Sequence, residues 1–335
     1  TSNAQAAGHR KKNLQKEIVR LRVYATRPGG HKDMTETKKR VTVIGPINAD
    51  ILTVGDYQGD WQTHFEWESP AQISLCTAGS AGYTLQDFNK LGSYTRIFSS
   101  IGDDSIGAAL RSDMERQGID TTCLFTHPDS NTAIGVYWLM HGNKKRPLAY
   151  QMSDFSPWPQ VWDAEIETSL LSADLLHCGG YLHYPSMFFG KTAELYRKAK
   201  DRGIITSIDT QFPLIPGKTL SPWLQNMTDI LPYVDVLIMD ENEARAFTGR
   251  KDVDEAVSVL APYPLKVIVV KFGSEGSRIY SQEGMIQQPA IHVGETLDTI
   301  GAGDAYGAAF LTYYMEGRSI SECARFAWTV SNVRI

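Results

Sequence analysis

The segment LDTIGAGDAYGAAFL, residues 297–311, combines closely spaced glycines with a single acid at the start of an apolar run. Gly301 and Gly303 flank Ala302, and glycine in a packed segment costs backbone entropy. Two glycines within three residues therefore indicate a backbone that bends tightly or approaches a ligand closely. Asp304 follows where the first turn of a helix leaves unpaired N–H groups. The pattern predicts either an anion-binding turn with an acid–base residue at its edge or a capped helix.

Other polar residues stand where short apolar runs end. In sheets made of parallel strands, ligands bind beyond the carboxyl ends of the strands. Each such residue alone is a common cap or turn residue, but several together at strand ends predict a binding site along one edge of a sheet. The residues in these positions are Asn48, Asp50, Asp209, Asp240, Asp298 and Asp304.

Short β-branched runs alternate with helical patterns along most of the chain. This alternation predicts an α/β fold, a three-layer α/β/α sandwich around a mostly parallel, Rossmann-like central sheet. The expected strands are 41–45, 95–102, 173–180, 203–209, 234–240 and 266–273. The expected helices are 81–92, 106–118, 187–203, 241–249 and a final amphipathic helix over 320–335, and we expect the natural chain to extend past Ile335.

Two aromatic segments with alternating polarity interrupt this rhythm, at about 53–76 and 131–152. Their pattern predicts strands that pair as a small antiparallel sheet outside the main body. Such a sheet is either a lid over a site or a dimer surface, and one sheet can serve both purposes.

The bulk composition favours a soluble globular protein. Hydrophobic residues make up 42% and charged residues 21% of the chain, which is ordinary for such proteins. No apolar run approaches the ~18–20 residues that span a bilayer, which argues against an integral membrane protein. Four scattered cysteines without metal-type spacing fit reduced thiols and a cytoplasmic location.

The net charge of −5 is distributed unevenly. Residues 1–40 carry eleven Lys or Arg against three Asp or Glu, a balance of +8, so the remaining chain carries −13. That acidic body argues against nucleic acid as its partner. The basic leader could be a targeting or membrane-surface segment, but its opening TSNA resembles a tag remnant and Met34 begins a stretch typical of a natural N-terminus. We expect 1–40 to be a tag or disordered basic extension and 41–335 to be the folded domain.

Motifs distributed over about residues 41–335 resemble the ribokinase (PfkB-type) carbohydrate kinase family. DTIGAGDAYGAAFL is similar to the family's C-terminal signature, D-T-x-G-A-G-D followed by small residues. The resemblance implies a ribokinase-like fold and an ATP-dependent transfer of the γ-phosphate to an alcohol of a sugar or sugar-like small molecule. The other resembling motifs are GPINADI (45–51), TAGSAGYTLQDFNKLG (77–92), IGDDSIGAALRSDMERQGID (101–120), DENEA (240–244) and KFGSEGS (271–277).

The resemblance also implies catalytic roles for the glycine turn. Asp304 would be the base that takes a proton from the acceptor alcohol. The turn of Gly301, Ala302 and Gly303, with the N–H of Asp304, would form an anion hole for the transferring phosphoryl group.

Further roles follow from the same resemblance. Three groups of residues would contact the substrate, the nucleotide and the cations, with Mg²⁺ held through water, as suits an ion that dehydrates reluctantly. The substrate-binding residues would be Asn48, Asp50 and Gly79. The nucleotide-binding residues would be Lys271, Gly273 and Gly276. The metal-binding residues would be Glu243 and Asp240 for Mg²⁺ and Asp298 for a monovalent cation such as K⁺.

Four positions depart from the family's motifs. Asp240 stands where the family's N-x-x-E motif has Asn, Tyr83 replaces an Asn of the substrate loop, and Ala78 replaces a Gly. Lys271 stands where a Thr is common, and it either reaches a nucleotide phosphate or is a solvated lysine at a strand end. These departures concern the identity of the acceptor more than the type of reaction.

The sequence also fits two alternative functions. A nucleoside kinase of the same fold could stack a base on Phe65, Trp67, Tyr137 and Trp138 of the lid segments. A catalytically weak nucleotide- or sugar-binding protein is the alternative from another class, but a binder needs no base beside its anion hole. The expected partners are a small sugar or nucleoside and, through the lid, a second copy of the chain, with neither nucleic acid nor membrane.

Overall fold

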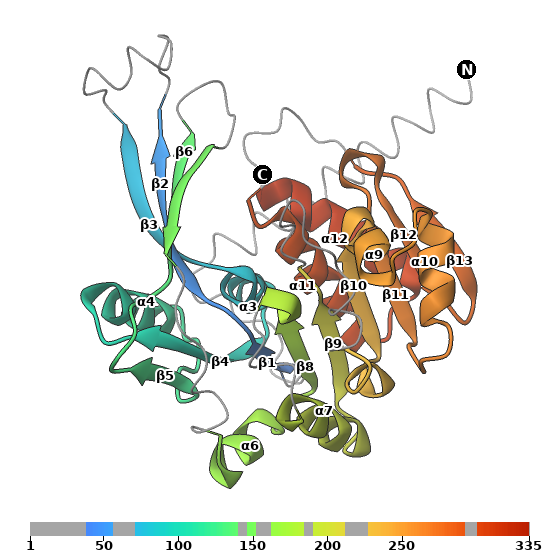
Figure 1. Ribbon diagram of the computed structural model, residues 1–335, viewed down its shortest axis with the longest axis horizontal. Coiled ribbons are helices and arrows are strands. Elements are labelled where there is room, and N and C mark those ends of the chain that lie inside the picture. The colour runs from blue at the N-terminus through green and yellow to red at the C-terminus, as the bar shows by residue number, and fades with distance from the viewer. Residues whose placement is uncertain are drawn as a thin grey trace.

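The computed structural model describes residues 38–55, 71–139, 146–151, 162–183, 190–211, 227–291 and 300–334. These ranges form a large sheet with strand order β13-β12-β11-β10-β9-β8-β1-β4-β5 and a small sheet with order β3-β2-β6-β7. The small sheet stands away from the body, which contains the large sheet and its helices (Figure 1). The predicted layered α/β fold with a separate small sheet is confirmed. The domain limit at residue 41 stays a prediction.

Seven strands of the large sheet run parallel, from β11 to β5, and an antiparallel hairpin of β12 and β13 extends one edge. The sequence patterns predicted six of the parallel strands. They missed β5, which has only four residues, and the edge hairpin. The strands are β1 (Arg40–Ile44), β4 (Tyr94–Gly102), β5 (Leu124–His127), β8 (Leu175–Gly179), β9 (Ile205–Asp209), β10 (Val236–Asp240), β11 (Val267–Lys271), β12 (Ser277–Ser281) and β13 (Gly284–Gln288).

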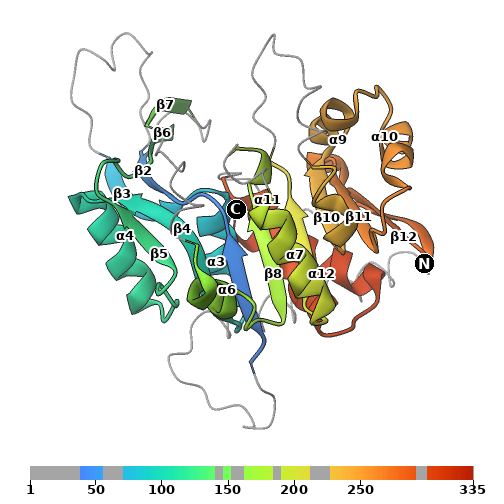
Figure 2. The same ribbon diagram turned by 60° about the horizontal axis from the view of Figure 1, so that its bottom comes forward.

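Helices cover both faces of this sheet (Figure 2). The expected helix over 187–203 begins only at Lys191 in the described chain, after Gly190. One face carries α3 (Ser80–Lys90), α4 (Ser105–Arg116), α11 (Ala302–Met315) and α12 (Ile320–Arg334). The other face carries α6 (Ala164–Leu170), α7 (Lys191–Asp201), α9 (Glu241–Thr248) and α10 (Val253–Leu260).

Strand β10 shows why the parallel strands are continuous apolar runs. Val236 and Ile238 pack into the cluster beneath α11 and α12, whereas Leu237 and Met239 pack into the cluster beneath α7 and α9. All four side chains are fully buried. Burying one such side chain contributes roughly 1.5–3 kcal/mol, so both faces of the strand stabilise the fold. The carboxyl ends of these strands are thereby held rigidly along one edge.

The small sheet contains β2 (Asn48–Val54), β3 (Gln72–Ala78), β6 (Ile134–Leu139) and β7 (Arg146–Gln151). Strands β6 and β7 lie within the predicted segment 131–152, whereas β2 lies mostly before the predicted segment 53–76 and β3 extends two residues past it. The expectation of a purely antiparallel sheet was wrong, because β2 and β6 pair in parallel. Parallel neighbours need a long crossover, which the chain supplies by returning to the body through α3, β4, α4 and β5 between them.

Asp104 connects the body to the small sheet. Its carboxylate accepts hydrogen bonds from the Gly107 N–H (2.7 Å), which caps α4, and from the Thr132 N–H (2.8 Å) and Oγ1 (2.7 Å) at the start of the segment that leads into β6. Burial opposes ionisation, but these bonds together hold the pKa of Asp104 below its usual value. A Cβ on Gly102 would overlap the backbone near Thr132. The G-x-D segment therefore fixes where the strands of the small sheet leave the body.

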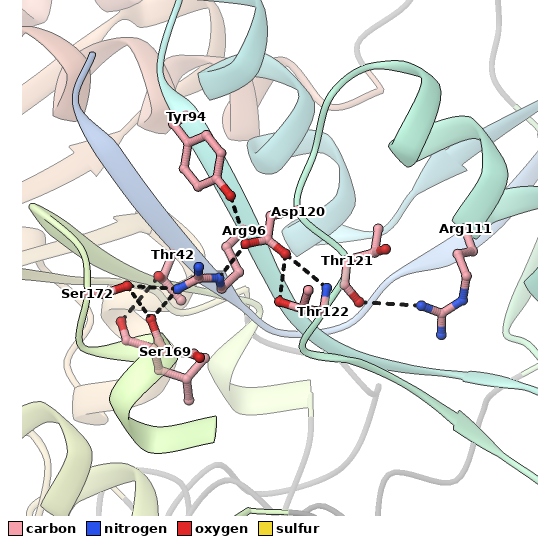
Figure 3. Close-up of polar contacts among 10 residues, drawn as sticks. Thr42, Tyr94, Arg96, Arg111, Asp120, Thr121, Thr122, Ser169 and Ser172 are labelled. Carbon is pink, nitrogen blue, oxygen red and sulfur yellow. Dashed lines mark hydrogen bonds and ion pairs between the residues drawn. The ribbon is translucent and has the colours of Figure 1, made fainter. Parts of the chain in front are cut away.

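A second polar network ties the amino end of β4 to α6 (Figure 3). The Arg96 guanidinium donates to Asp120 (2.8 Å), to Ser172 Oγ (3.0 Å) and to the Ser169 carbonyl, and the Tyr94 hydroxyl also donates to Asp120 (2.8 Å). Burial alone would raise the pKa of Asp120, but its hydrogen bonds lower that pKa to about 2. This network lies at the opposite end of β4 from the strand ends that carry the predicted site.

Candidate active site

The carboxyl ends of β9, β10 and β11 and the start of α11 bring one lysine and three carboxylates together. Asp209, Glu243 and Asp304 are all less than 10% exposed, and each affects the ionisation of another member of the group. Asp209 Oδ2 accepts a hydrogen bond from Lys271 Nζ at 2.9 Å. A buried charge cluster of this kind is expensive to maintain and marks a candidate functional site.

Lys271 is not a solvated lysine, the alternative that the sequence left open. Its side chain is only 15% exposed. Burial opposes its charge, but the neighbouring carboxylates of Asp209 and Glu243 more than compensate and raise the pKa of Lys271 above its usual value. The residue therefore stays a cation inside the site at neutral pH.

The glycine turn does form the start of a helix. Gly301 adopts a left-handed conformation (φ 71°) as the cap of α11, which begins at Ala302. The Ala305 N–H already bonds the Gly301 carbonyl (2.9 Å), so the preceding N–H groups of the first turn, including those of Gly303 and Asp304, are available to a ligand. A Cβ on Gly303 would lie 3.3 Å from Lys271 Nζ. The Lys271 ammonium group therefore lies next to the N-terminus of α11, and both attract a negatively charged phosphate.

Asp304 is buried in the first turn of α11. Its Oδ1 accepts hydrogen bonds from Gln211 Nε2 (3.0 Å) and Ser80 Oγ (3.3 Å). Burial, reinforced by the charge of Asp209, raises the pKa of Asp304 to about 7. A general base works best when its pKa lies near the working pH, so this carboxylate can accept a proton under neutral conditions.

Glu243 and Asp240 form a reciprocal cap at the start of α9. Glu243 Oε2 accepts the Asp240 N–H (2.7 Å) and the Thr210 hydroxyl (3.1 Å), while Asp240 Oδ1 accepts the Glu243 N–H (2.7 Å). Burial, followed by the charge of Asp209, raises the pKa of Glu243 to about 7. The two expected metal residues therefore lie side by side, and each has a capping role as well.

The described residues contain no group of three His, Cys, Asp or Glu side chains that could hold a metal ion. The described residues therefore do not form a site in which protein side chains alone fill the coordination shell of a metal ion. The carboxylates of Glu243 and Asp240 fit an ion that keeps most of its water and is shared with a phosphate. Asp298, the expected residue for a monovalent cation, lies outside the described residues.

The expected substrate residues lie together where the small sheet meets the body. Asn48 Nδ2 donates to Asp50 Oδ1 (2.6 Å), and a Cβ on Gly79, which has φ 82°, would lie 2.5 Å from Asn48 Oδ1. Tyr83 donates its hydroxyl to Asp50 Oδ2 at 2.5 Å. Both oxygens of the buried Asp50 thus already accept hydrogen bonds from the protein. Tyr137 also lies here, because a Cβ on Gly135 of β6 would be 2.7 Å from the Tyr137 ring and 2.7 Å from Asp50 Oδ1.

The expected nucleotide glycines shape the turn between β11 and β12. Gly273 (φ 52°) is exposed, whereas a Cβ on Gly276 (φ 109°) would overlap the Gln288 carbonyl. Ser277 follows directly after this turn. Its hydroxyl forms a hydrogen bond with the Tyr306 hydroxyl of α11 (2.9 Å) and accepts one from the indole N–H of Trp328 in α12 (3.0 Å). The turn is thereby held beside the helix that carries Asp304.

Sequence reasoning missed two residues that contact Asp304, namely Ser80 and Gln211. Gln211 belongs to a polar run, Asp209-Thr210-Gln211, that follows a buried strand. That placement was the available signal, but only Asp209 was noted. Ser80 lies inside the motif at 77–92, but that motif did not indicate a contact with Asp304, which is 224 residues away in the chain.

A model of the pfkB family of carbohydrate kinases matches residues 69–335. This chain belongs to the pfkB carbohydrate kinase family. The ATP-dependent ribose-1-phosphate kinase of Halopiger xanaduensis is 24% identical over 288 residues, which cover 86% of this chain and 89% of that protein. The nucleoside kinase of Methanothermobacter thermautotrophicus is 26% identical over 297 residues, which cover 84% and 88%.

Solved structures agree on the fold of this pfkB-family kinase. An E. coli protein assigned as a ribokinase II, solved in complex with ATP and Mg²⁺, superposes with a TM-score of 0.71 at 19% identity, covering 88% of this chain and 92% of that one. The family and the ribokinase-like fold predicted from the motifs are confirmed, as is the general activity, an ATP-dependent carbohydrate kinase. The acceptor and the role of each residue are proposals.

Proposed function

We propose that this pfkB-family kinase transfers the γ-phosphate of ATP to an alcohol of a sugar or sugar-like small molecule, with Asp304 as the base. The observation that carries the proposal is the buried Asp304, with a pKa of about 7, at the helix start shared with Lys271. A protein that only binds a phosphate gains nothing from a carboxylate held there, because its charge repels the ligand. A kinase gains a proton acceptor at the point of transfer.

Each group has a separate task in this proposal. Both hydrogen bonds to Asp304 from the described residues end on Oδ1, so Oδ2 faces the acceptor alcohol and takes its proton. The first N–H groups of α11, from Ala302, Gly303 and Asp304 after the turn at Gly301, stabilise the charge that develops on the transferring phosphoryl group. Lys271 adds a positive charge at the same spot.

Glu243 and Asp240 would hold, through water, the Mg²⁺ that accompanies ATP, and that ion would neutralise phosphate charge. The turn at Gly273 and Gly276 would border the nucleotide. We keep Asp298 as the residue for a monovalent cation, with K⁺ as the ion to test.

The acceptor would bind between Asn48, Asp50 and Gly79 under the lid. Tyr83 and Tyr137 bring aromatic rings to Asp50, and this specific observation also favours a nucleoside, whose base can stack on a ring. The relatives named above include both a sugar-phosphate kinase and a nucleoside kinase. A sugar acceptor is the first candidate and a nucleoside the second.

The remaining proposals concern assembly and location. On β3, Ile73 is 69% and Leu75 is 45% exposed. A homodimer that formed through the lid would bury these apolar side chains, and their exposure supports that assembly. The cysteines at 76, 123, 178 and 323 are free thiols, which supports a cytoplasmic protein. None of the described helices is long and apolar enough to cross a membrane. The acidic charge of the chain beyond residue 40 supports a small-molecule partner rather than nucleic acid.

The test is ADP release from Mg-ATP across a panel of sugars, sugar phosphates, sugar acids and nucleosides, with and without K⁺. One acceptor that clearly exceeds the others would support the proposal, and its class would decide between sugar and nucleoside. Intact ATP binding with no acceptor-dependent ADP release would favour the binding-protein alternative instead.

A further inference from the structure

Three consecutive residues at the end of β9 each contact a different member of the charge cluster. The strand delivers them to the site because β9 lies between β8 and β10, in the middle of the parallel sheet. Asp209 was among the strand-end residues that predicted a binding site, but the motifs assigned a role to none of the three. The contacts are Asp209 to Lys271 (2.9 Å), Thr210 to Glu243 (3.1 Å) and Gln211 to Asp304 (3.0 Å).

Gln211 has an unusual backbone. Its φ is +38°, and it is the one non-glycine residue with positive φ in the described part of the chain. A residue with a Cβ is strained there and keeps the conformation only if its surroundings hold it. Its neighbour Thr210 is pinned on both sides, because its N–H bonds the Ile238 carbonyl (3.0 Å) and its carbonyl accepts the Leu182 N–H (3.1 Å). The fold thus maintains a strained residue at the site.

The side chain of Gln211 also lies in a defined place. Its Nε2 donates to Asp304 Oδ1, the same oxygen that accepts the Ser80 hydroxyl. Its Oε1 would lie 3.4 Å from a Cβ on Gly180, whose φ of +68° favours glycine. Two donors on one carboxylate oxygen fix the plane of the carboxylate and leave the second oxygen to another partner.

We propose that Gln211 is a positioning residue for Asp304: its amide orients the carboxylate so that Oδ2 meets the acceptor alcohol. The inference rests on the proposed function, since it takes Asp304 to be the base. The amide stabilises the charged carboxylate that the reaction requires, because a donor aimed at one oxygen favours the ionised form. It does not contact the substrate itself, so its loss affects turnover rather than binding.

The first test uses the acceptor identified by the panel and compares four variants of the full chain with the wild type. Gln211→Ala and Gln211→Gly remove the amide, and Gly also relieves the backbone strain. Gln211→Glu keeps the shape but cannot donate when ionised. Gln117→Ala is the matched control, because the Gln117 amide donates to the Asp113 carboxylate at 2.9 Å in α4.

We expect all three Gln211 variants to lower kcat at least tenfold, with KM for ATP and acceptor within twofold. The acid limb of the kcat profile should move to higher pH, because Asp304 loses a donor that favours its charged form. Gln117→Ala should match the wild type. Wild-type kcat in Gln211→Gly, or an unchanged pH profile in Gln211→Ala, would overturn the inference.

A second test needs no turnover. Urea midpoints of the wild type, Gln211→Ala, Asp304→Asn and the double variant are compared at pH 5 and pH 8. Gln211→Ala should lower the midpoint more at pH 8 than at pH 5, and this pH dependence should vanish when residue 304 is Asn. If Gln211→Ala lowers the urea midpoint by the same amount with Asp and with Asn at position 304, the inference is contradicted even if the kinase is active. A wild type without transfer activity contradicts the proposed function and leaves this test of the contact intact.

Discussion

The substitution Asp304→Asn should make the protein more stable while removing its proposed base. Asp304 is buried, and its pKa of about 7 lies well above the value of 3.8 for an unperturbed carboxyl. The folded state therefore binds the proton more tightly than the unfolded chain does. Stability contributed by this group is lost as pH rises from about 4 to about 7, and the full penalty applies above that range. Asn cannot ionise, and its carbonyl oxygen can still accept from Gln211 and Ser80.

The size of the gain follows from the two pKa values. Each pKa unit corresponds to about 1.4 kcal/mol, so the penalty that Asn removes is about 2 kcal/mol at pH 5 and about 4 kcal/mol at pH 8. Lys271 loses one neighbouring negative charge but keeps Asp209 at 2.9 Å, so these values are upper bounds.

The assay is urea unfolding of the wild type and Asp304→Asn at both pH values. The exposed Asp103, changed to Asn, serves as the control and should show no gain that grows with pH. If Asp304→Asn is no more stable at pH 8 than at pH 5 relative to the wild type, the carboxylate is not held at an energetic cost and the reasoning fails.

Three further predictions follow from other contacts. Lys271→Met should lower kcat at pH 7 at least tenfold and raise KM for ATP. The kcat should partly recover at higher pH, because Lys271 lowers the pKa of both Asp304 and Glu243. A kcat profile that does not move with pH would contradict this. Asp120→Asn should cost about 2 kcal/mol at pH 7, and the cost should fall to about 1 kcal/mol or less at pH 2.5, since the pKa of Asp120 is depressed to about 2. Unfolding curves at pH 7 and 2.5 would show this decrease. Tyr83→Phe removes the hydroxyl that donates to Asp50 and should raise KM for the acceptor at least fivefold with KM for ATP within twofold, so equal changes in both constants would argue against a role in acceptor binding.

Local patterns in the sequence predicted the parts of the site that are built from consecutive residues. The glycines around Ala302 indicated a tight turn before a helix, and the structure has Gly301 in a left-handed conformation there. Asp240 is one of the strand-end acids for which a capping role was the alternative, and with Glu243 it forms a capping box. Such features depend on neighbours within a few residues, so a single chain shows them directly.

Contacts between distant elements could not be predicted in this way. The pair of Lys271 and Asp209 joins residues 62 apart in the chain, and only the sheet order places them together. The same sheet order buries the Lys271 side chain, whereas a strand-end lysine in solvent would not be buried. The parallel pairing of β2 with β6 has the same origin, because two of the three strands between them, β4 and β5, belong to the large sheet.

The positive φ of Gln211 is the feature furthest from prediction. Glutamine has no preference for that conformation, and the surrounding hydrogen bonds impose it. Positions where the sequence gives no local reason for the observed conformation are expected at functional sites.

The central claim is that Asp304 removes the proton from the acceptor alcohol during phosphoryl transfer. The most direct measurement is the single-turnover rate of transfer from Mg-ATP to the identified acceptor in the wild type and Asp304→Asn, with the affinity for both ligands measured in parallel. The account predicts a loss of at least about a hundredfold in rate, with both affinities within threefold and the variant folded. A rate within threefold of the wild type would show that another group takes the proton and would contradict the claim.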